Sequence, residues 1–294
     1  MELRSPIRLY WDITPLPSLP PDYERLCAEI ATSRALTLDI TDSSDSLSDI
    51  TASIINRLAT SSMAISLILA RTALAQALPL IERGKVRKLV ADVATFEGLA
   101  ELLQRSQKVN DRPPYGISWR VSRENFDTLP DLLEWCLEHG VSELVLPMER
   151  LTPGAETFCL SRNEHERLAR SVARVSFNGK LTITVHDPFL WRAVYPDVPF
   201  PGGVCQAANT MLYIDPKGDV YPCPAMPVLL GSLIDRSFRD IVSSEAKREV
   251  RRRIVTLPSG CAACGLQAEC RGGCRGRGYA GKESWDDADP GCGV

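Results

Sequence analysis

Residues Cys261–Cys274 read CAACGLQAECRGGC, and this stretch limits how the last third of the chain can fold. Four of its fourteen residues are cysteine, a density too high for a helical or strand scaffold. Its C-x2-C pair puts two thiolates on one tight turn, and thiolates select zinc or iron–sulfur clusters. Glycines in and around the stretch allow the positive-φ turns that wrapping an inorganic centre requires. A metal site is the leading interpretation, and at this point iron–sulfur, a zinc knot and a disulfide cluster all stay open.

The remaining cysteines extend this pattern. The chain has ten cysteines in 294 residues, and seven of them lie in its last third. The seven are Cys205, Cys223, Cys261, Cys264, Cys270, Cys274 and Cys292. In a chain of this length without a secretion signal, clustered cysteines more often bind metal than form disulfides. Arg271, Arg275 and Arg277 interleave with them, and guanidinium groups in these positions would offset the negative charge of a thiolate-bound cluster. The basic stretch Lys247–Arg253 fits this role and a solvated helix face equally well.

Composition and charge exclude several classes of protein. Hydrophobic residues make up 44% and charged residues 24%, which is typical of a globular chain. The formal charge, 34 minus 37, is -3 and gives no electrostatic case for nucleic acid or an anionic membrane as a partner. The longest apolar run, Met63–Ala70, is too short to cross a bilayer, and Met1–Pro6 lacks the apolar core of a secretory signal. A cytoplasmic protein is expected.

The first 200 residues alternate between apolar runs and stretches of helical period. Strands are predicted at Ile7–Ile13, Ala35–Ile40, Ala64–Ala70, Lys88–Val93, Tyr115–Val121, Glu143–Leu146 and Lys180–Val185. Helices are predicted at Leu47–Leu58, Thr72–Arg83, Phe96–Leu103, Phe126–Leu137 and Glu164–Val175. This alternation predicts an α/β fold with βαβ units and a parallel sheet. Seven strands favour a partial (β/α) barrel over an open sheet of six strands.

A Pro-rich stretch from Tyr195 to Gly203 predicts a domain boundary, with one domain at 1–200 and a second at 201–294. Beyond it, Met211–Ile214 and Asp219–Tyr221 predict a β-hairpin around a Gly-containing turn. Ser237–Ile254 predicts one basic helix, and the rest of the tail is expected to be a Gly/Cys-rich coil.

The order C-x12-G-x4-C, then C-x2-C-x5-C-x3-C, then a final cysteine resembles the SPASM domain of radical S-adenosylmethionine (radical SAM) peptide-maturing enzymes. The stretches Leu212–Cys223 and Cys270–Arg275 look like its two signatures, and Gly218 stands at the expected glycine. The resemblance implies two auxiliary 4Fe–4S clusters. It assigns Cys261, Cys264, Cys270 and Cys292 to an outer cluster, and Cys205, Cys223 and Cys274 to an inner one. The inner cluster then has three thiolates, and its fourth iron is open or bound by another group.

The first domain resembles the partial barrel of radical SAM proteins without its chemistry. After the strand-like stretch Leu9–Thr14, where the family carries C-x3-C-x2-C, this chain has Pro15–Pro20, and the nearest thiol is Cys27. Asp39–Asp42 replaces the Gly-Gly-Glu-Pro stretch expected after the second strand. We therefore expect a degenerate radical-SAM-like partial (β/α) barrel that binds no S-adenosylmethionine.

This combination resembles the SPASM-domain protein of the GeoRSP system. The resemblance implies partners: an intact radical SAM/SPASM enzyme, a PqqD-like peptide chaperone (similar to the one in pyrroloquinoline quinone biosynthesis) and a ribosomally made peptide. The leading hypothesis is an accessory iron–sulfur protein that serves peptide modification by electron transfer, peptide docking or both, and that is not an autonomous radical SAM enzyme. The alternatives are a stand-alone enzyme using an open cluster iron as a Lewis acid and a zinc-stabilised docking module.

Other candidate residues have plainer explanations. Cys136 lies on the apolar face of a predicted helix, so a buried structural thiol is expected, and Cys27 and Cys159 are scattered through the same domain. The histidines have no ligand spacing, and the pair His186-Asp187 is expected to be polar residues at a barrel rim. Asp45 and Asp49 are expected to favour the N-terminal end of the helix that begins near Leu47.

Overall fold

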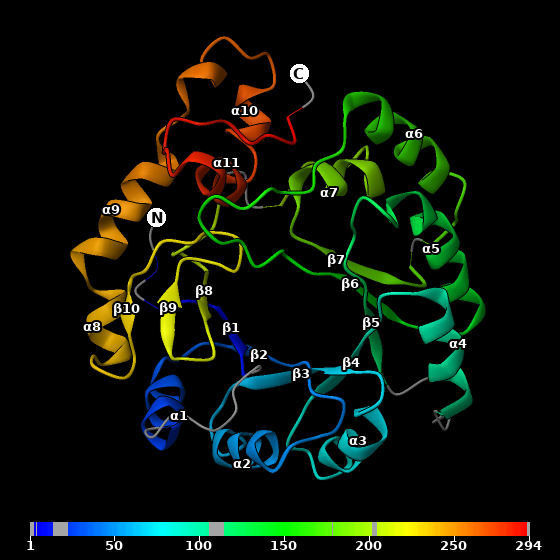
Figure 1. The fold of residues 1–294 in the computed structure, drawn as a ribbon, viewed down its shortest axis with the longest axis vertical. Helices are drawn as coiled ribbons and strands as arrows, with labels where there is room; N and C mark the ends of the chain where they lie inside the picture. The colour runs from blue at the N-terminus through cyan, green and yellow to red at the C-terminus, as the bar shows by residue number, and fades with distance from the viewer. Residues whose placement is uncertain are drawn as a thin grey trace. The chain divides into compact units, whose positions relative to one another are not determined.

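A computed structural model describes residues 3, 5–13, 23–105, 115–177, 179–201 and 205–292 (Figure 1). Contacts divide the chain into two compact units. The first consists of Met1–Ser118, Ala207–Cys223 and Val228–Arg251, and the second of Trp119–Gln206, Pro224–Pro227 and Arg252–Val294. The two units do not follow the predicted boundary at residue 200. Residues 207–223 and 228–251 group with the first strands, and residues 119–200 group with the end of the chain. The division into 1–200 and 201–294 stays a prediction.

The first unit is built on a sheet whose strands run in the order β10-β9-β8-β1-β2-β3-β4-β5. Its strands are β1 (Arg8–Asp12), β2 (Thr37–Asp42), β3 (Ala64–Ala70), β4 (Lys88–Asp92), β5 (Gly116–Ser118), β8 (Met211–Ile214), β9 (Asp219–Tyr221) and β10 (Gly231–Ser232). Strands β1 to β5 pair in parallel, β8 pairs in parallel with β1, and β9 is antiparallel to both β8 and β10. The predicted hairpin is confirmed as β8 and β9.

One face of this sheet is mainly apolar because alternate side chains point to opposite faces of a strand. In β2, Leu38 and Ile40 are completely buried, whereas Thr37 and Asp39 are half-buried. The helices of this unit are α1 (Tyr23–Thr32), α2 (Asp49–Leu58), α3 (Leu74–Glu82), α4 (Phe96–Arg105), α8 (Phe238–Val242) and α9 (Glu245–Val255), whose last residues belong to the second unit. Figure 1 shows α1, α2 and α3 along the outer side of β1 to β4.

The start of α2 has a local cause. The Ser48 side chain accepts a hydrogen bond from the Thr51 backbone N–H, and Asp49 occupies the first turn, where a negative charge stabilises the helix dipole. The helix thus begins two residues later than predicted, with Asp49 in the role expected of it.

The hairpin turn requires glycine at Gly218. Its φ is +90°, and a Cβ there would lie 2.8 Å from Leu26 Cδ2 of α1. The turn closes through the Gly218 backbone N–H, which donates to the Asp215 carbonyl at 3.0 Å. The backbone conformation disfavours any side chain at this position, and a Cβ would also require the Leu26 side chain to shift.

The second unit contains two parallel strands and most of the remaining helices. Its elements are η1 (Phe126–Thr128), α5 (Leu129–Glu138), β6 (Glu143–Leu146), α6 (Arg162–Val172), β7 (Thr182–Val185), α7 (Pro188–Val194), η2 (Ser259–Cys261), α10 (Gln267–Cys270) and α11 (Arg275–Lys282). The α6 helix begins with a capping box between Ser161 and Glu164.

All seven predicted strands are present, so the prediction of an α/β fold is confirmed. The single basic helix predicted over Ser237–Ile254 is wrong, because the chain breaks at Ser243 and Ser244 into α8 and α9. The coil predicted for the end of the tail is also wrong, since it contains the short helices α10 and α11. Helices α1 and α7 were not predicted. None of the helices in the described ranges combines the length and the apolar character that a membrane crossing requires.

Candidate metal centre

Four half-buried thiols of the second unit share one electrostatic neighbourhood. They are Cys261, Cys264, Cys270 and Cys292. Burial raises the pKa of Cys261, and the charges of the other three thiols raise it further. The chain reaches them by turns: the Cys264 backbone N–H donates to the Cys261 carbonyl at 3.1 Å, and the Cys292 backbone N–H to the Asp289 carbonyl at 2.9 Å. The four residues are the ones that the resemblance assigns to an outer cluster.

Backbone donors converge on one of these sulfurs. Burial raises the pKa of Cys270, while Arg192 and the backbone N–H groups of Gly273 and Gly272, which hydrogen-bond to it, lower that pKa. Three consecutive residues adopt positive φ here: Arg271 (50°), Gly272 (90°) and Gly273 (67°). Successive N–H groups in such a turn form a concave site that favours negative charge. The turn can therefore hold a thiolate that is bound to a cluster.

A second group lies at the start of α11. Burial raises the pKa of Cys274 to about 12; Arg277 lowers it, and Asp289 and Cys205 raise it. Cys274 and Cys205 are therefore electrostatic neighbours within the second unit. Cys223, the third thiol predicted for the inner cluster, belongs to the first unit, where it is 5% exposed.

A buried ion network holds the backbone of Cys274. The Asp289 carboxylate accepts hydrogen bonds from the backbone N–H of Cys274 (2.6 Å) and of Gly291 (3.0 Å), and from Nε (2.9 Å) and Nη2 (2.8 Å) of Arg277. Burial opposes the charge of Arg277, but Asp187 and Asp289 raise its pKa well above the ordinary value. These two carboxylates thus fix the guanidinium in place, and Asp289 fixes Cys274 with it.

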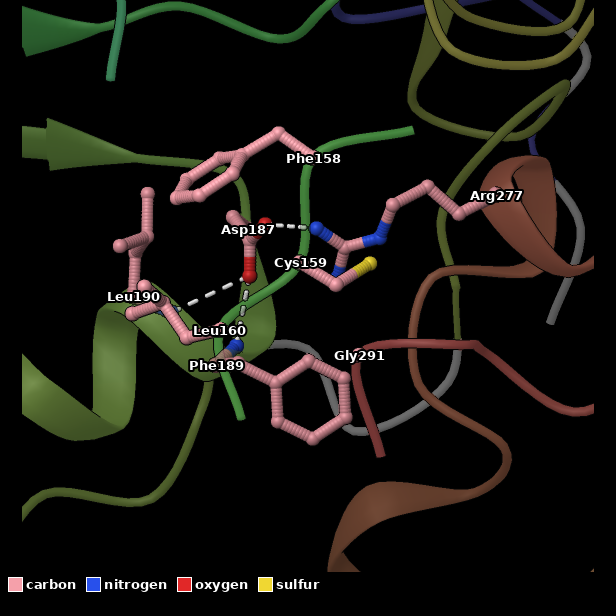
Figure 2. Close-up of a pocket in the computed structure, with 8 residues that line it drawn as sticks. All are labelled: Phe158, Cys159, Leu160, Asp187, Phe189, Leu190, Arg277 and Gly291. Atoms are coloured by element: carbon pink, nitrogen blue, oxygen red, sulfur yellow. Dashed lines mark hydrogen bonds and ion pairs between the residues drawn. The ribbon is translucent and has the colours of Figure 1, made fainter. Parts of the chain in front are cut away.

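A small pocket lies beside this network (Figure 2). Its lining residues are Phe158, Cys159, Leu160, Asp187, Phe189, Leu190, Arg277 and Gly291. Asp187 caps α7 by accepting from the backbone N–H groups of Phe189 (2.7 Å) and Leu190 (3.1 Å), and it also pairs with Arg277. The Cys159 thiol lies beside the Arg277 guanidinium, yet burial raises its pKa, so it is protonated at neutral pH.

The charge of Arg275 interacts with cysteines of both groups. The residue is 2% exposed, and its charge interacts with Cys205, Cys261 and Cys274. Among the described residues its Nε has no hydrogen-bond partner. Six tail thiols of the second unit, a concave turn of N–H donors and a buried donor without a partner among the described residues are groups that thiolate-bound iron–sulfur clusters need, so the residues present fit such clusters.

The other candidates have structural roles. Cys136 is completely buried and Cys27 is 2% exposed, and burial raises their pKa values to about 12 and about 11. His139 and His165 hydrogen-bond to backbone carbonyls, and Asp187 is satisfied as described. In the described ranges, no three His, Cys, Asp or Glu side chains surround a point where one ion would sit; in a 4Fe–4S cluster each thiolate binds a different iron.

Of the two stretches that stand where the radical SAM motifs were expected, the structure describes only one. The stretch Pro15–Pro20 lies outside the described residues. Asp39–Asp42 forms most of β2, and the buried Asp42 carboxylate accepts from the Thr51 hydroxyl and from the Ser44 backbone N–H. Asp42 is thus a satisfied core residue.

A row of polar side chains crosses the sheet of the first unit, and sequence patterns did not reveal it. Strand register places one residue of each of six neighbouring strands side by side: Tyr221, Tyr213, Tyr10, Asp39, Ser66 and Lys88. Next to the row, the Tyr213 hydroxyl donates to Asp12 at 3.0 Å, and Arg8 lies 3.9 Å from Asp39. Tyr10 is 8% exposed and the other five are half-buried. This face of the sheet carries a continuous row of hydrogen-bonding groups, in contrast to the mainly apolar opposite face.

The chain carries a SPASM domain, since residues 205–265 match the family model of the SPASM iron–sulfur cluster-binding domain. The match includes Cys205, Cys223, Cys261 and Cys264 and ends before Cys270, Cys274 and Cys292. The mycofactocin maturase MftC of Mycolicibacterium smegmatis is 28% identical over 185 residues, which cover 60% of this chain and 46% of that protein. The chain thus spans about half the length of this curated relative.

The fold is that of solved radical SAM enzymes. The crystal structure of Streptococcus suis SuiB bound to S-adenosylmethionine matches with a TM-score of 0.67 at 14% identity, covering 100% of this chain and 78% of that one. The structure of anSMEcpe with bound AdoMet and a peptide matches with a TM-score of 0.66 at 13% identity, covering 97% and 94%. The prediction of a partial (β/α) barrel followed by a SPASM domain is confirmed.

Proposed function

We propose that this protein is an accessory iron–sulfur protein that acts with a partner radical SAM enzyme in peptide modification. The observation that carries the proposal is the grouping of the tail thiols: Cys264, Cys270 and Cys292 raise the pKa of Cys261, and Cys205 raises that of Cys274, so their thiolates need a positively charged centre to coexist. When bound, 4Fe–4S clusters supply one-electron redox chemistry. The four thiols proposed for the outer cluster are half-buried, and Cys223 of the inner cluster is buried.

Two clusters divide the seven cysteines. Cys261, Cys264, Cys270 and Cys292 hold the outer cluster, which is supported by their mutual charge interactions and by the N–H donors on Cys270. Cys274, Cys205 and Cys223 hold the inner cluster, which is supported by the charge interaction between Cys274 and Cys205. The inner cluster has one iron without a cysteine.

The accessory role follows from what the first domain lacks in sequence. Pro15–Pro20 contains no cysteine where the radical SAM motif would stand. Cys27, the nearest thiol, is buried with a pKa of about 11, as a structural cysteine would be. The chain therefore binds no S-adenosylmethionine and relies on a partner to cleave it, although SuiB and anSMEcpe were solved with that cofactor bound.

The partners are a radical SAM/SPASM enzyme and a PqqD-like chaperone that presents a ribosomally made peptide. Support for a peptide comes from the anSMEcpe structure, which has a peptide bound, and from the maturase named among the relatives. The polar row across β9, β8 and β1 to β4 gives a peptide hydrogen-bonding groups along one face of the sheet.

Anaerobic purification and reconstitution, with and without the proposed radical SAM/SPASM partner enzyme, test the proposal. Two 4Fe–4S clusters correspond to about eight irons per chain and a brown protein. We expect the enzyme to co-elute with the iron-loaded chain and the mixture to modify the peptide faster than the enzyme alone. A colourless protein with zinc, or a chain that cleaves S-adenosylmethionine unaided, would contradict it.

A further inference from the structure

The structure separates three arginines that look equivalent in sequence. Arg271 and Arg275 each follow a predicted ligand directly, and Arg277 is two residues further on. Arg271 is exposed, and its Nε donates to the Ala268 carbonyl at 3.4 Å. The Arg277 guanidinium forms ion pairs with Asp289 and Asp187. Neither of these two guanidinium groups is buried with a hydrogen-bond donor left over.

Arg275 differs from both in its hydrogen bonds. Its Nη2 donates to the Trp285 carbonyl at 2.5 Å and its Nη1 to the Asp287 carbonyl at 3.2 Å, which orients the guanidinium plane. Its Nε is buried and has no hydrogen-bond partner in the part of the chain that the structure describes. A buried donor of a charged group is costly to leave unsatisfied, so this Nε–H points to an acceptor that the chain itself does not provide.

The position of Arg275 connects it to both cysteine groups. Its charge interacts with Cys205 and Cys274 of one group and with Cys261 of the other. Arginine keeps its proton at any physiological pH, so the positive charge is fixed. A fixed positive charge favours whichever oxidation state of a neighbouring centre is more negative, which for an iron–sulfur cluster is the reduced state.

We propose that Arg275 is a positioning residue shared by two iron–sulfur centres, whose charge raises the reduction potential of both and whose Nε–H donates a hydrogen bond to a sulfur of one of them. The inference rests on the proposed function, because it requires a centre at each cysteine group. It goes further by assigning the coupling of the two centres to one residue.

Redox titration of the full-length, iron-loaded chain tests the proposal, with the EPR signal of each centre as the readout. In Arg275→Gln we expect the ratio of reduced to oxidised centre at a fixed solution potential to fall at least tenfold for both centres, which corresponds to about 59 mV for one electron. Arg271→Gln is the matched control, since Arg271 also follows a ligand cysteine but faces solvent, and its ratios should change less than about twofold. Arg275→Lys keeps the charge and lacks the Nε–H, so its ratios should fall by less than those of Arg275→Gln.

Two results would overturn the inference. One is an iron-loaded Arg275→Gln protein in which either centre titrates as in the wild type; the other is a shift no larger than that of Arg271→Gln. If Arg275→Gln does not retain iron, Arg275→Lys decides: a lower ratio at the one centre that loses the Nε–H bond supports the inference, and wild-type ratios at both centres overturn it. A wild-type chain without iron would overturn the proposed function and the inference with it, whereas unshifted potentials in iron-loaded protein overturn the inference alone.

Discussion

Cysteines occur in two contrasting regions of this protein. On α5, Cys136 is completely buried beside Leu132 and Leu133, and burial alone raises its pKa to about 12. In the turns around α10, Cys261 is half-buried, and its pKa rises because of burial and because of three neighbouring thiols. The Cys136 thiol packs as a small apolar group, whereas thiolates in the second region would repel one another.

The contrast shows what each region needs for stability. A single thiol among leucines needs close packing only, and it stays protonated. Four grouped thiols need positive charge and hydrogen-bond donors if they are to ionise, and Arg192, Arg275 and the N–H groups of Gly272 and Gly273 are placed to supply them. Changes at matched residues of the two regions should therefore have different consequences.

The largest difference is expected in metal content. Cys264→Ala removes one of the four ligands proposed for the outer cluster and should lower the iron content by about half, since each of the two proposed 4Fe–4S clusters holds four irons. Cys136→Ala removes a thiol of the same chemistry from an apolar core and should leave the iron content unchanged while lowering the free energy of unfolding. Iron and sulfide analysis of both anaerobically reconstituted variants measures this difference. Equal iron contents would contradict the separation of the two regions, and loss of all iron in Cys264→Ala would show that the two clusters assemble together.

The second difference concerns charge burial next to the ligands. Asp289 has a fully buried side chain that holds Arg277 and the Cys274 backbone. Asp289→Ala leaves a buried guanidinium with Asp187 as its remaining carboxylate, and removing one partner of a buried pair costs about 3–5 kcal/mol of unfolding free energy. Urea unfolding of the iron-free protein measures the loss. Asp286→Ala is the control, because Asp286 is an exposed carboxylate in the same loop that hydrogen-bonds to Ser259, and its loss should be far smaller. Equal losses would contradict the assignment of Asp289 as the anchor.

The parallel sheet could be predicted from the sequence because its strands bury apolar residues. The strands of the parallel sheet are short apolar runs, and each was found within a few residues of its predicted position. Helix α1 was not predicted, because its buried residues Leu26, Cys27 and Ile30 lie in a charged segment that is too short to show a clear helical period. Pairing of β8 with β1 joins segments about two hundred residues apart, and no local pattern encodes such a contact.

The proposed metal site could be predicted from the sequence for a different reason. Spacing of the cysteines predicted the ligand set that we propose, because turns around a metal constrain how far apart the thiols can lie in sequence. Spacing could not rank the interleaved arginines, since their burial depends on residues from the following loop. The carbonyls of Trp285 and Asp287 hold Arg275, and Asp289 holds Arg277. In the sequence, nothing marks Asp289 as part of the site except its place three residues before Cys292.

A smaller effect tests how tightly the cysteine turns are packed. An added Cβ at Gly276 of α11 would lie 2.2 Å from the Ala225 carbonyl oxygen, whereas one at Gly260 would have no atom within 4 Å. Alanine favours a helix by up to about 1 kcal/mol over glycine, but a clash with backbone outweighs this, and Gly276→Ala should destabilise by about 1–3 kcal/mol. Gly260→Ala should stay within about 0.5 kcal/mol of the wild type. Thermal unfolding of both variants measures the difference, and a stabilised Gly276→Ala would show that this region is loosely packed.

The smallest effect is expected from acid, which acts on carboxylates and leaves protonated thiols unchanged. At the start of α6, the backbone N–H and the hydroxyl of Ser161, followed by Arg123, lower the pKa of Glu164 to about 2. A carboxyl whose pKa is lower in the folded state contributes stability above its unfolded pKa of about 4.3, and this contribution is lost as pH falls toward 2. The free energy of unfolding should therefore depend less on pH between about 4.5 and 2 in Glu164→Gln than in the wild type. Urea unfolding at a series of pH values measures both slopes. Parallel slopes would mean that the capping box contributes nothing measurable, and that the helices of this unit depend on apolar burial of the kind seen around Cys136.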